Sequence, residues 1–195
     1  MRAVDILYEA SCLLNNDETS SFLKDYIEAL DAETELPVAT SSVEAFVNKL
    51  LVCLNMTVER IASEHIFLKK EEPLTSDENG KIGYSSFSSR VFEVVKVFDS
   101  ITGEELVPYF AFDGLVMPLK YRPYKVLYKF VPSVVTDLDD EIVVPTLVSS
   151  RLLCFGIVAD FLLTRNVFDE AREWNNKFLD GIRLVSRLSR ERVFR

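Results

Sequence analysis

The sequence has few of the residues on which enzymes and metal sites usually depend. Its 195 residues include one histidine and three cysteines. Cys12, Cys53 and Cys154 lie far apart beside aliphatic residues and form no Cys-x-x-Cys pair, which predicts free, buried thiols and no zinc site. His65 is the one imidazole available as a base, and it lies at a predicted helix end, where a surface or capping role is expected. We therefore expect no enzyme activity and no cofactor.

Long apolar runs are also missing. The longest, Leu152–Ala159, is closed by Arg151 and Asp160 and is too short to cross a bilayer. The N-terminus does not resemble a signal peptide, because Asp5 and Glu9 interrupt its apolar residues. These features predict a soluble intracellular protein with no membrane partner.

Two short motifs that could mark ligand sites have the wrong spacing. The acidic stretch Asp137–Glu141 could begin a calcium loop, but Ile142 and Val148 stand where an EF-hand needs glycine and glutamate. A solvated acidic turn before a helix is the favoured interpretation. The stretch Gly80–Ser85 lacks the spacing of a phosphate-binding loop. Metal and nucleotide sites are therefore not expected.

Charge is unevenly distributed along the chain. The formal net charge is −9, yet Arg183–Arg195 holds five arginines against Glu191 alone. Such a basic end on an acidic protein can mark a segment that meets an acidic partner surface. It can equally be a solvated helix end, where cations are favoured by the helix dipole.

The first third of the sequence predicts helices. Apolar residues recur at helical spacing over Val4–Leu14, and a second helix can be capped by Asp17 or Thr19. A Ser-x-x-Glu capping box at Ser41 opens a longer helix that runs to about Ile61. Lys69–Gly80 is predicted to be a loop.

The middle third is rich in β-branched and aromatic residues. Phe92–Phe98 predicts a strand, Asp99–Glu105 a turn, and Val107–Phe112 a strand that pairs across that turn. Asp113-Gly114 is a strong hairpin signal, and Tyr124–Phe130 predicts a further strand. We expect three to five antiparallel strands.

The last third returns to a helical pattern. Val144-Pro145 is predicted to open an apolar helix, since proline is tolerated in the first turn. That helix should be the central one, with Leu152, Phe155, Val158 and Leu162 buried. Asn166 is expected to cap a charged helix whose apolar stripe reaches Val185.

The predicted fold class is therefore α+β. Residues 1–70 and 144–189 should form a helical bundle, and residues 81–131 a β-rich insertion. Residues 190–195 should form a basic C-terminal tail.

Aromatic and basic residues alternate before and within the last strand. The basic residues are Lys120, Arg122, Lys125 and Lys129, and the interleaved aromatic residues are Tyr121, Tyr124 and Tyr128. Such a cluster could stack nucleic-acid bases, although these sites normally need a basic groove. Because the chain is acidic overall, a half-buried sheet in a protein interface is favoured.

The order of features over Tyr124–Val185 resembles the late half of head-to-tail adaptor (connector) proteins of tailed phages. An aromatic strand, a proline, an acidic turn, a hydrophobic-Pro step and two helices follow one another. The residues that carry this order are Val126, Tyr128, Pro132, Leu138, Asp140, Val144-Pro145, Gly156, Glu170-Ala171, Trp174 and Phe178. The N-terminal helices and the inserted β-rich segment also fit that family.

The resemblance implies a structural protein in the neck of the virion, assembled in the host cytoplasm. Adaptors form a ring, commonly dodecameric, below the portal protein. They close the DNA exit channel and offer a platform to a tail or nozzle protein, and DNA passes without specific recognition. Family members often dock on the portal through a C-terminal extension, for which the candidate contacts here are Arg183, Arg187, Arg190, Arg192, Phe194 and Arg195.

A second hypothesis is a cytosolic α+β protein-binding module of a bacterial host, with no virion role. The genes beside this one would discriminate between the two, since portal and capsid genes would favour the adaptor.

Overall fold

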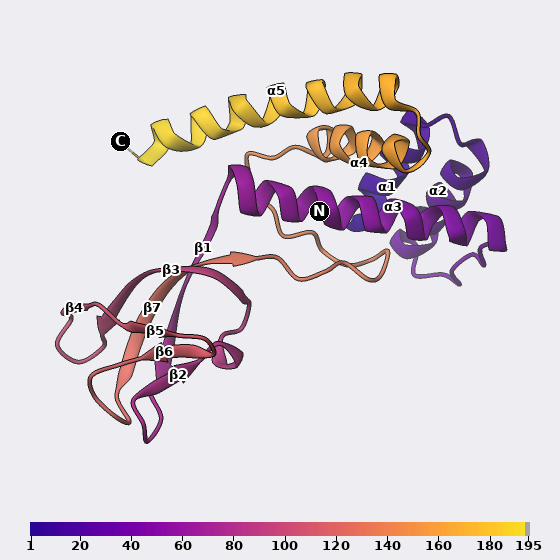
Figure 1. Cartoon of the computed structure of the whole chain (residues 1–195). Helices are drawn as coiled ribbons and strands as arrows, with labels where there is room; N and C mark the ends of the chain where they lie inside the picture. Colours follow the sequence, from indigo (N-terminus) through magenta and orange to yellow (C-terminus); the bar gives the residue numbers. More distant parts are fainter. Residues whose placement is uncertain (194–195) are drawn as a thin grey trace. The chain divides into compact units, whose positions relative to one another are not determined.

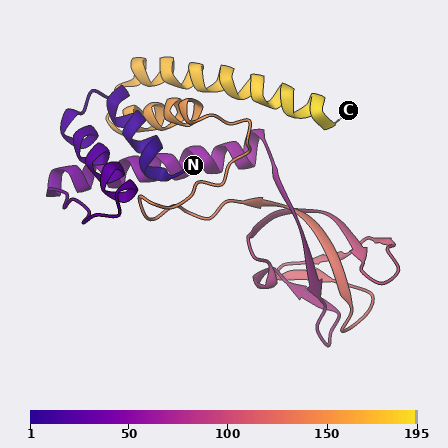
Figure 2. The ribbon, with the colours of Figure 1, turned by 180° about the vertical axis from the view of Figure 1, so that it is seen from behind.

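The computed structural model describes residues 1–193, with side chains described through Arg187. The protein has the predicted α+β fold and divides into two compact units (Figures 1 and 2). The helical unit comprises residues 1–66 together with the chain from Val134 onward, and the β-rich unit comprises Phe67–Ser133. The β-rich unit therefore begins before residue 81, because a strand forms where a loop was predicted.

The helical unit contains five α-helices within the described residues, and α4 is the central one. The helices are α1 (Ala3–Leu13), α2 (Asp17–Asp31), α3 (Ser41–Arg60), α4 (Ser150–Thr164) and α5 (Phe168–Val193), with a π-helical turn η1 (Ile61–His65) directly after α3. Helix α4 packs against α1, α3 and α5, as its apolar sequence predicts. None of the helices in the described part of the chain is long and apolar enough to span a membrane.

Asparagine and glutamate residues in the left-handed conformation end three of the helices. Asn15, Glu33 and Asn166 have φ angles of 52°, 52° and 60°. After α4, the amide of Asn166 bonds to the carbonyl of Leu163, and the next amide bonds to Leu162, which is a Schellman motif. Asn166 therefore ends α4, and its predicted role as the N-cap of α5 is wrong.

Two other predicted helix starts shift by a few residues. Asn16 caps α2, with its side chain accepting a hydrogen bond from the amide of Thr19, so neither predicted cap is used. Thr40 caps α3, one residue before the predicted capping box. In both cases a polar side chain immediately upstream satisfies a free amide of the first turn.

The predicted helix start at Val144-Pro145 is wrong. The connecting segment Val134–Ser149 is irregular, with a short turn in which the amide of Val148 bonds to the carbonyl of Pro145. Helix α4 begins only at Ser150, because the Ser149 side chain accepts a hydrogen bond from the amide of Leu152.

The predicted core of α4 is correct at three of its four positions. Leu152, Val158 and Leu162 are buried. Phe155 is only partly buried, and its ring lies 5.5 Å from that of Trp174 on α5. Phe155 therefore lies at the margin of the core.

The β-rich unit contains seven strands among the described residues, more than the three to five predicted. The strands are β1 (Leu68–Thr75), β2 (Lys81–Gly83), β3 (Arg90–Asp99), β4 (Glu105–Leu106), β5 (Tyr109–Ala111), β6 (Gly114–Val116) and β7 (Pro123–Val131), with a 3₁₀ turn η2 (Tyr84–Ser86) after β2. They form a four-stranded sheet in the order β1-β7-β3-β4 and a three-stranded sheet in the order β2-β6-β5. All pairings are antiparallel.

Strand β1 occupies most of the segment that was predicted to be a loop. It pairs with β7 along its whole length, which places Pro73 opposite Lys125 on an edge strand, where proline is tolerated. Glu72 is buried and accepts hydrogen bonds from the Ser88 amide and hydroxyl, with Lys70 Nζ at 2.8 Å. This polar sequence forms a strand because β7 pairs with it along its whole length, and because Ser88 and Lys70 satisfy the buried Glu72 carboxylate.

The hairpin signal at Asp113-Gly114 is confirmed. Strands β5 and β6 pair across a two-residue turn that ends at Asp113. The predicted pairing of Val107–Phe112 across the turn at Asp99–Glu105 is wrong, because the short β4 occupies that place beside β3.

Candidate interaction surfaces

Helix α5 is held against the helical unit by a buried stripe on one face. The stripe consists of Ala171, Phe178, Ile182 and Val185. Gly156 on α4 lets the helices approach closely, because an added Cβ would lie 2.5 Å from Thr57 Cγ2 and 3.1 Å from the Phe178 ring. The packing fixes which face of α5 is buried and leaves its charged face exposed.

A partly buried ion pair joins α3 and α4 beside α5. The Asp160 carboxylate accepts hydrogen bonds from Thr57 Oγ1 at 3.1 Å and from Arg60 Nη1 at 3.3 Å. The Arg60 guanidinium lies 4.5 Å from the centre of the Phe178 ring. Burial raises the pKa of Asp160, and Arg60 opposes that shift. The cluster therefore sets the position of α5 and has the features of a structural ion pair.

His65 ends the π-helical turn, at a helix end as predicted, but its side chain is partly buried and not the exposed surface group that was expected. Its ring packs edge-on to Phe178, with the ring centres 6.4 Å apart. Burial lowers the pKa of His65, against the opposing charge of Glu64. A neutral imidazole at neutral pH fits this apolar contact.

The predicted basic contact lies on the C-terminal part of α5, which extends beyond the start of α4 (Figures 1 and 2). Arg183 and Arg187 are exposed and one helical turn apart, and Arg183 pairs with Asp180 at 3.1 Å. The helix continues through Val193, so the predicted tail at residues 190–195 begins as helix. The side chains of Arg190 and Arg192, and all of Phe194 and Arg195, lie outside the described residues.

The aromatic and basic cluster before and within β7 does not form a base-stacking platform. Tyr124 and Tyr128 are fully buried in the core of the β-rich unit. Arg122 pairs with the buried Asp99, with Nε 2.7 Å from Oδ2, and this pairing lowers the pKa of Asp99 to about 2. Lys129 pairs with Glu93 at 2.6 Å. Tyr121 is exposed, but two of the three rings are enclosed and Arg122 and Lys129 are paired, so the nucleic-acid interpretation is not favoured.

The β-rich unit instead exposes many apolar side chains. They lie on β3, on β5 and its hairpin turn and in the adjoining loops, and comprise Phe92, Ile101, Val107, Tyr109, Phe110, Phe112, Leu119 and Tyr121. Phe112 at the hairpin turn is fully exposed. Exposed apolar groups of this density mark an interaction surface more often than a free surface.

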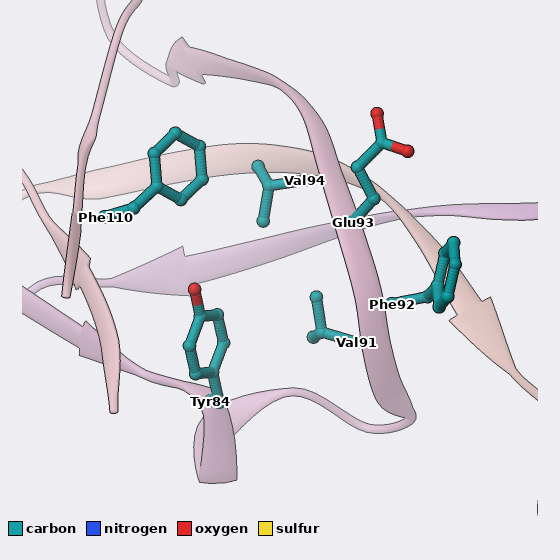
Figure 3. A pocket seen from close by; sticks show the side chains of 6 residues that line it. All are labelled: Tyr84, Val91, Phe92, Glu93, Val94 and Phe110. Carbon is teal, nitrogen blue, oxygen red and sulfur yellow. The ribbon is translucent and has the colours of Figure 1, made fainter. Parts of the chain in front are cut away.

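Part of this apolar surface forms an open cleft between β3 and the β5–β6 hairpin. The cleft is lined by Tyr84, Val91, Phe92, Glu93, Val94 and Phe110, with a volume of about 380 Å³. Figure 3 shows Tyr84, Val91, Val94 and Phe110 facing the same space, while Phe92 and Glu93 project from the other side of β3. Sequence reasoning predicted the strands and missed the cleft, because it depends on how two sheets face each other.

A bulged pairing explains how Val91 and Val94 both face the cleft. In a regular strand, residues three apart point to opposite faces. The register of β3 against β7 shifts between Val91 and Glu93 and again between Val94 and Lys96. The extra residue at the first shift lies between Val91 and Val94 and reverses the alternation there, whereas the second shift lies beyond Val94.

The thiols are free, but not all are buried as predicted. Cys12 is exposed, whereas Cys53 and Cys154 are buried. Burial raises the pKa of the Cys53 thiol to about 11, so it is protonated at neutral pH. Among the side chains that the structure describes, through Arg187, no group of three His, Cys, Asp or Glu residues is placed to hold a metal ion.

The acidic turn before α4 is held together by hydrogen bonds to one of its own carboxylates. The carboxylate of Asp140 accepts hydrogen bonds from the amides of Thr136 and Asp137, and these bonds lower its pKa.

The chain matches no protein-family model and has no significant match among curated proteins. The molecule therefore offers two candidate surfaces: the basic end of α5, and the apolar surface of the β-rich unit.

Proposed function

We propose that the protein is an adaptor subunit of a tailed-phage virion, which joins the portal to the tail and closes the DNA exit channel as part of a ring. The observation that carries this proposal is the order of the elements along the chain. A β-rich unit is inserted between α3 and α4 of a helical unit, and an acidic turn precedes the last two helices. The resemblance to adaptor proteins implies this order of elements.

The basic end of α5 is the proposed contact with the portal. Arg183 and Arg187 are exposed and lie one helical turn apart, so they share one side of the helix. The arginine guanidinium pairs bidentately with carboxylates, so an acidic portal surface is the fitting partner. Each contact is weak alone, but repetition around a ring would give strong attachment through avidity.

The apolar surface of the β-rich unit is proposed to meet neighbouring subunits or a tail or nozzle protein. A surface with this many exposed aromatic side chains is covered in the assembled state, since aromatic residues are enriched in interface cores. An adaptor in the neck of a virion has partners on both sides and beside it.

Charge reversal on α5 tests the portal contact. Arg183→Glu with Arg187→Glu should abolish binding to purified portal rings from the same virus, measured by co-sedimentation and electron microscopy. Arg172→Glu is the matched control, because Arg172 is exposed on the same helix near its other end. The control should bind normally.

Three outcomes would separate the hypotheses. Rings of the unmodified protein on portals support the adaptor. Normal binding by the double variant would leave the adaptor in place and exclude this portal contact. A protein that never binds portals would instead favour a cytosolic protein-binding module.

A further inference from the structure

The backbone edge of β3 is free beside the apolar cleft. Strand β7 pairs along one edge of β3, whereas β4 pairs with the other edge only at Val97 and Phe98. Over Val91–Lys96, no described residue forms a backbone pair on that second edge. A free strand edge next to a groove for side chains is the geometry used for binding an added strand.

The charges around the cleft are balanced within the β-rich unit. Glu93 pairs with Lys129 at 2.6 Å, and Lys96 pairs with Glu105 at 2.9 Å. The cleft walls formed by Val91, Val94, Tyr84 and Phe110 are apolar apart from the tyrosine hydroxyl. An added strand should therefore be uncharged where it enters the cleft.

The same chain carries a segment with matching properties between α2 and α3. Residues 36–39 have the sequence Leu-Pro-Val-Ala and lie outside the helices. Exposure alternates along them: Leu36 is 40% and Val38 is 93% exposed, whereas Pro37 and Ala39 are partly buried. This is the alternation of a strand that presents Leu36 and Val38 on one side.

The backbone of this segment is also available for pairing. Within the described residues, the amides of Leu36 and Val38 form no backbone hydrogen bond. In a strand, alternate residues direct their backbone groups to the same edge. If Leu36 and Val38 pair with β3, Pro37 takes the outward position, where its missing N–H costs no hydrogen bond.

We propose that Leu36–Ala39 of one copy adds as a strand to the free edge of β3 in a second copy, with Leu36 and Val38 in the cleft. Both surfaces are accessible within one chain; the segment carries no charge, and Glu93, the charged residue in the cleft lining, is paired with Lys129. Because segment and cleft are different surfaces, the contact is heterologous, so each copy donates one segment and accepts another. Contacts of this kind generate rings or open filaments.

This inference deepens the proposed function, since an adaptor needs a ring. The inference can nevertheless be tested without a portal, because the proposed contact joins copies of one chain. Rings that form on portals from a Val38→Asp variant would keep the function and overturn the inference. Strand addition between copies of a protein that does not bind portals would keep the inference and overturn the proposed function.

A complementation experiment tests the contact in solution. Val38→Asp damages the donated segment, and Phe110→Asp damages the cleft. Each should weaken self-association more than about tenfold in sedimentation velocity, because the contact would bury a charge. An equal mixture should form dimers, since the first variant keeps an intact cleft and the second an intact segment. Val52→Asp, at another exposed valine, should associate like the unmodified protein.

Disulfide trapping tests the same contact by position. All chains carry Cys12→Ser, because Cys12 is the exposed native thiol among the described residues. A Val38→Cys chain mixed with a Val94→Cys chain should form a covalent heterodimer on mild oxidation, whereas Val52→Cys with Val94→Cys should not. An unmodified protein that stays monomeric and gives no trapped heterodimer would overturn the proposal, as would two surface variants that associate normally.

Discussion

Replacing Asp160 by alanine should destabilise the helical unit by about 2–4 kcal/mol. The carboxylate is only 7% exposed and is the hydrogen-bond acceptor for Thr57 and Arg60. Removing one partner of a fully buried pair typically costs about 3–5 kcal/mol, because the other charge is left uncompensated. The Arg60 side chain is 24% exposed, so water can solvate part of its charge and the expected cost is lower.

Replacing Arg60, the partner of Asp160, separates the contribution of charge to stability from the contribution of packing. Arg60→Met leaves the Asp160 carboxylate buried without its cation, so its already raised pKa should rise further. A group whose pKa is raised on folding contributes stability below its unfolded pKa and loses it as pH rises through the folded pKa. Arg60→Met should therefore be less destabilising near about pH 5 than near about pH 8. The double variant Arg60→Met, Asp160→Leu should be more stable than Asp160→Ala alone.

The assay is urea denaturation followed by tryptophan fluorescence. The chain has one tryptophan, Trp174, which lies on α5 and so reports on the helical unit. The midpoint and slope of each transition give the free energy of unfolding. A loss below about 0.5 kcal/mol for Asp160→Ala would show that the pair behaves like an exposed one. Equal destabilisation of Arg60→Met at both pH values would refute the electrostatic reasoning.

Three further substitutions test the packing, a helix end and the β-rich unit. Phe178→Ala should cost about 3–5 kcal/mol in the same melts, because its ring is fully buried, whereas Phe155→Ala should cost about 1–2 kcal/mol at the margin of the core. Asn166→Val should cost at least about 1 kcal/mol because of its left-handed backbone, and Asn166→Gly should be tolerated in thermal melts. Asp99→Asn should lower the stability of the β-rich unit at neutral pH, measured by tyrosine near-UV circular dichroism. The difference in stability between Asp99→Asn and the unmodified protein should vanish as the pH falls toward about 2. There the Asp99 carboxylate, whose pKa is lowered in the folded protein, also becomes protonated.

The sequence predicts the helices of this protein better than its strands. Apolar periodicity identifies α3 and α5 because each buries a continuous stripe, and such a stripe is visible in local sequence. Strand β1 was missed because its Lys-Lys-Glu-Glu-Pro sequence has low strand propensity and no alternating pattern. It forms because β7, distant in the sequence, pairs with it, and because Ser88 and Lys70 satisfy the buried Glu72.

The same difference applies to the candidate surfaces. The basic end of α5 was predictable, since charge on a helix end can be counted along the sequence. The cleft was not, because Val91 and Val94 share a face only through the shift in the β3 register that lies between them. Phe110 reaches the same space from a second sheet, and no local pattern encodes that approach.

The two surfaces differ in the physical basis of their proposed contacts, and this difference assigns them different roles. Attachment through Arg183 and Arg187 would be screened by salt, because both side chains are exposed. Strand addition at Val91–Lys96 would depend on backbone hydrogen bonds and apolar burial, which salt weakens little. An assembly that uses both can hold its copies together while its attachment to a charged partner varies with conditions. The apolar contact is thus suited to building the proposed ring, and the basic helix end is suited to placing such a ring on the proposed portal partner.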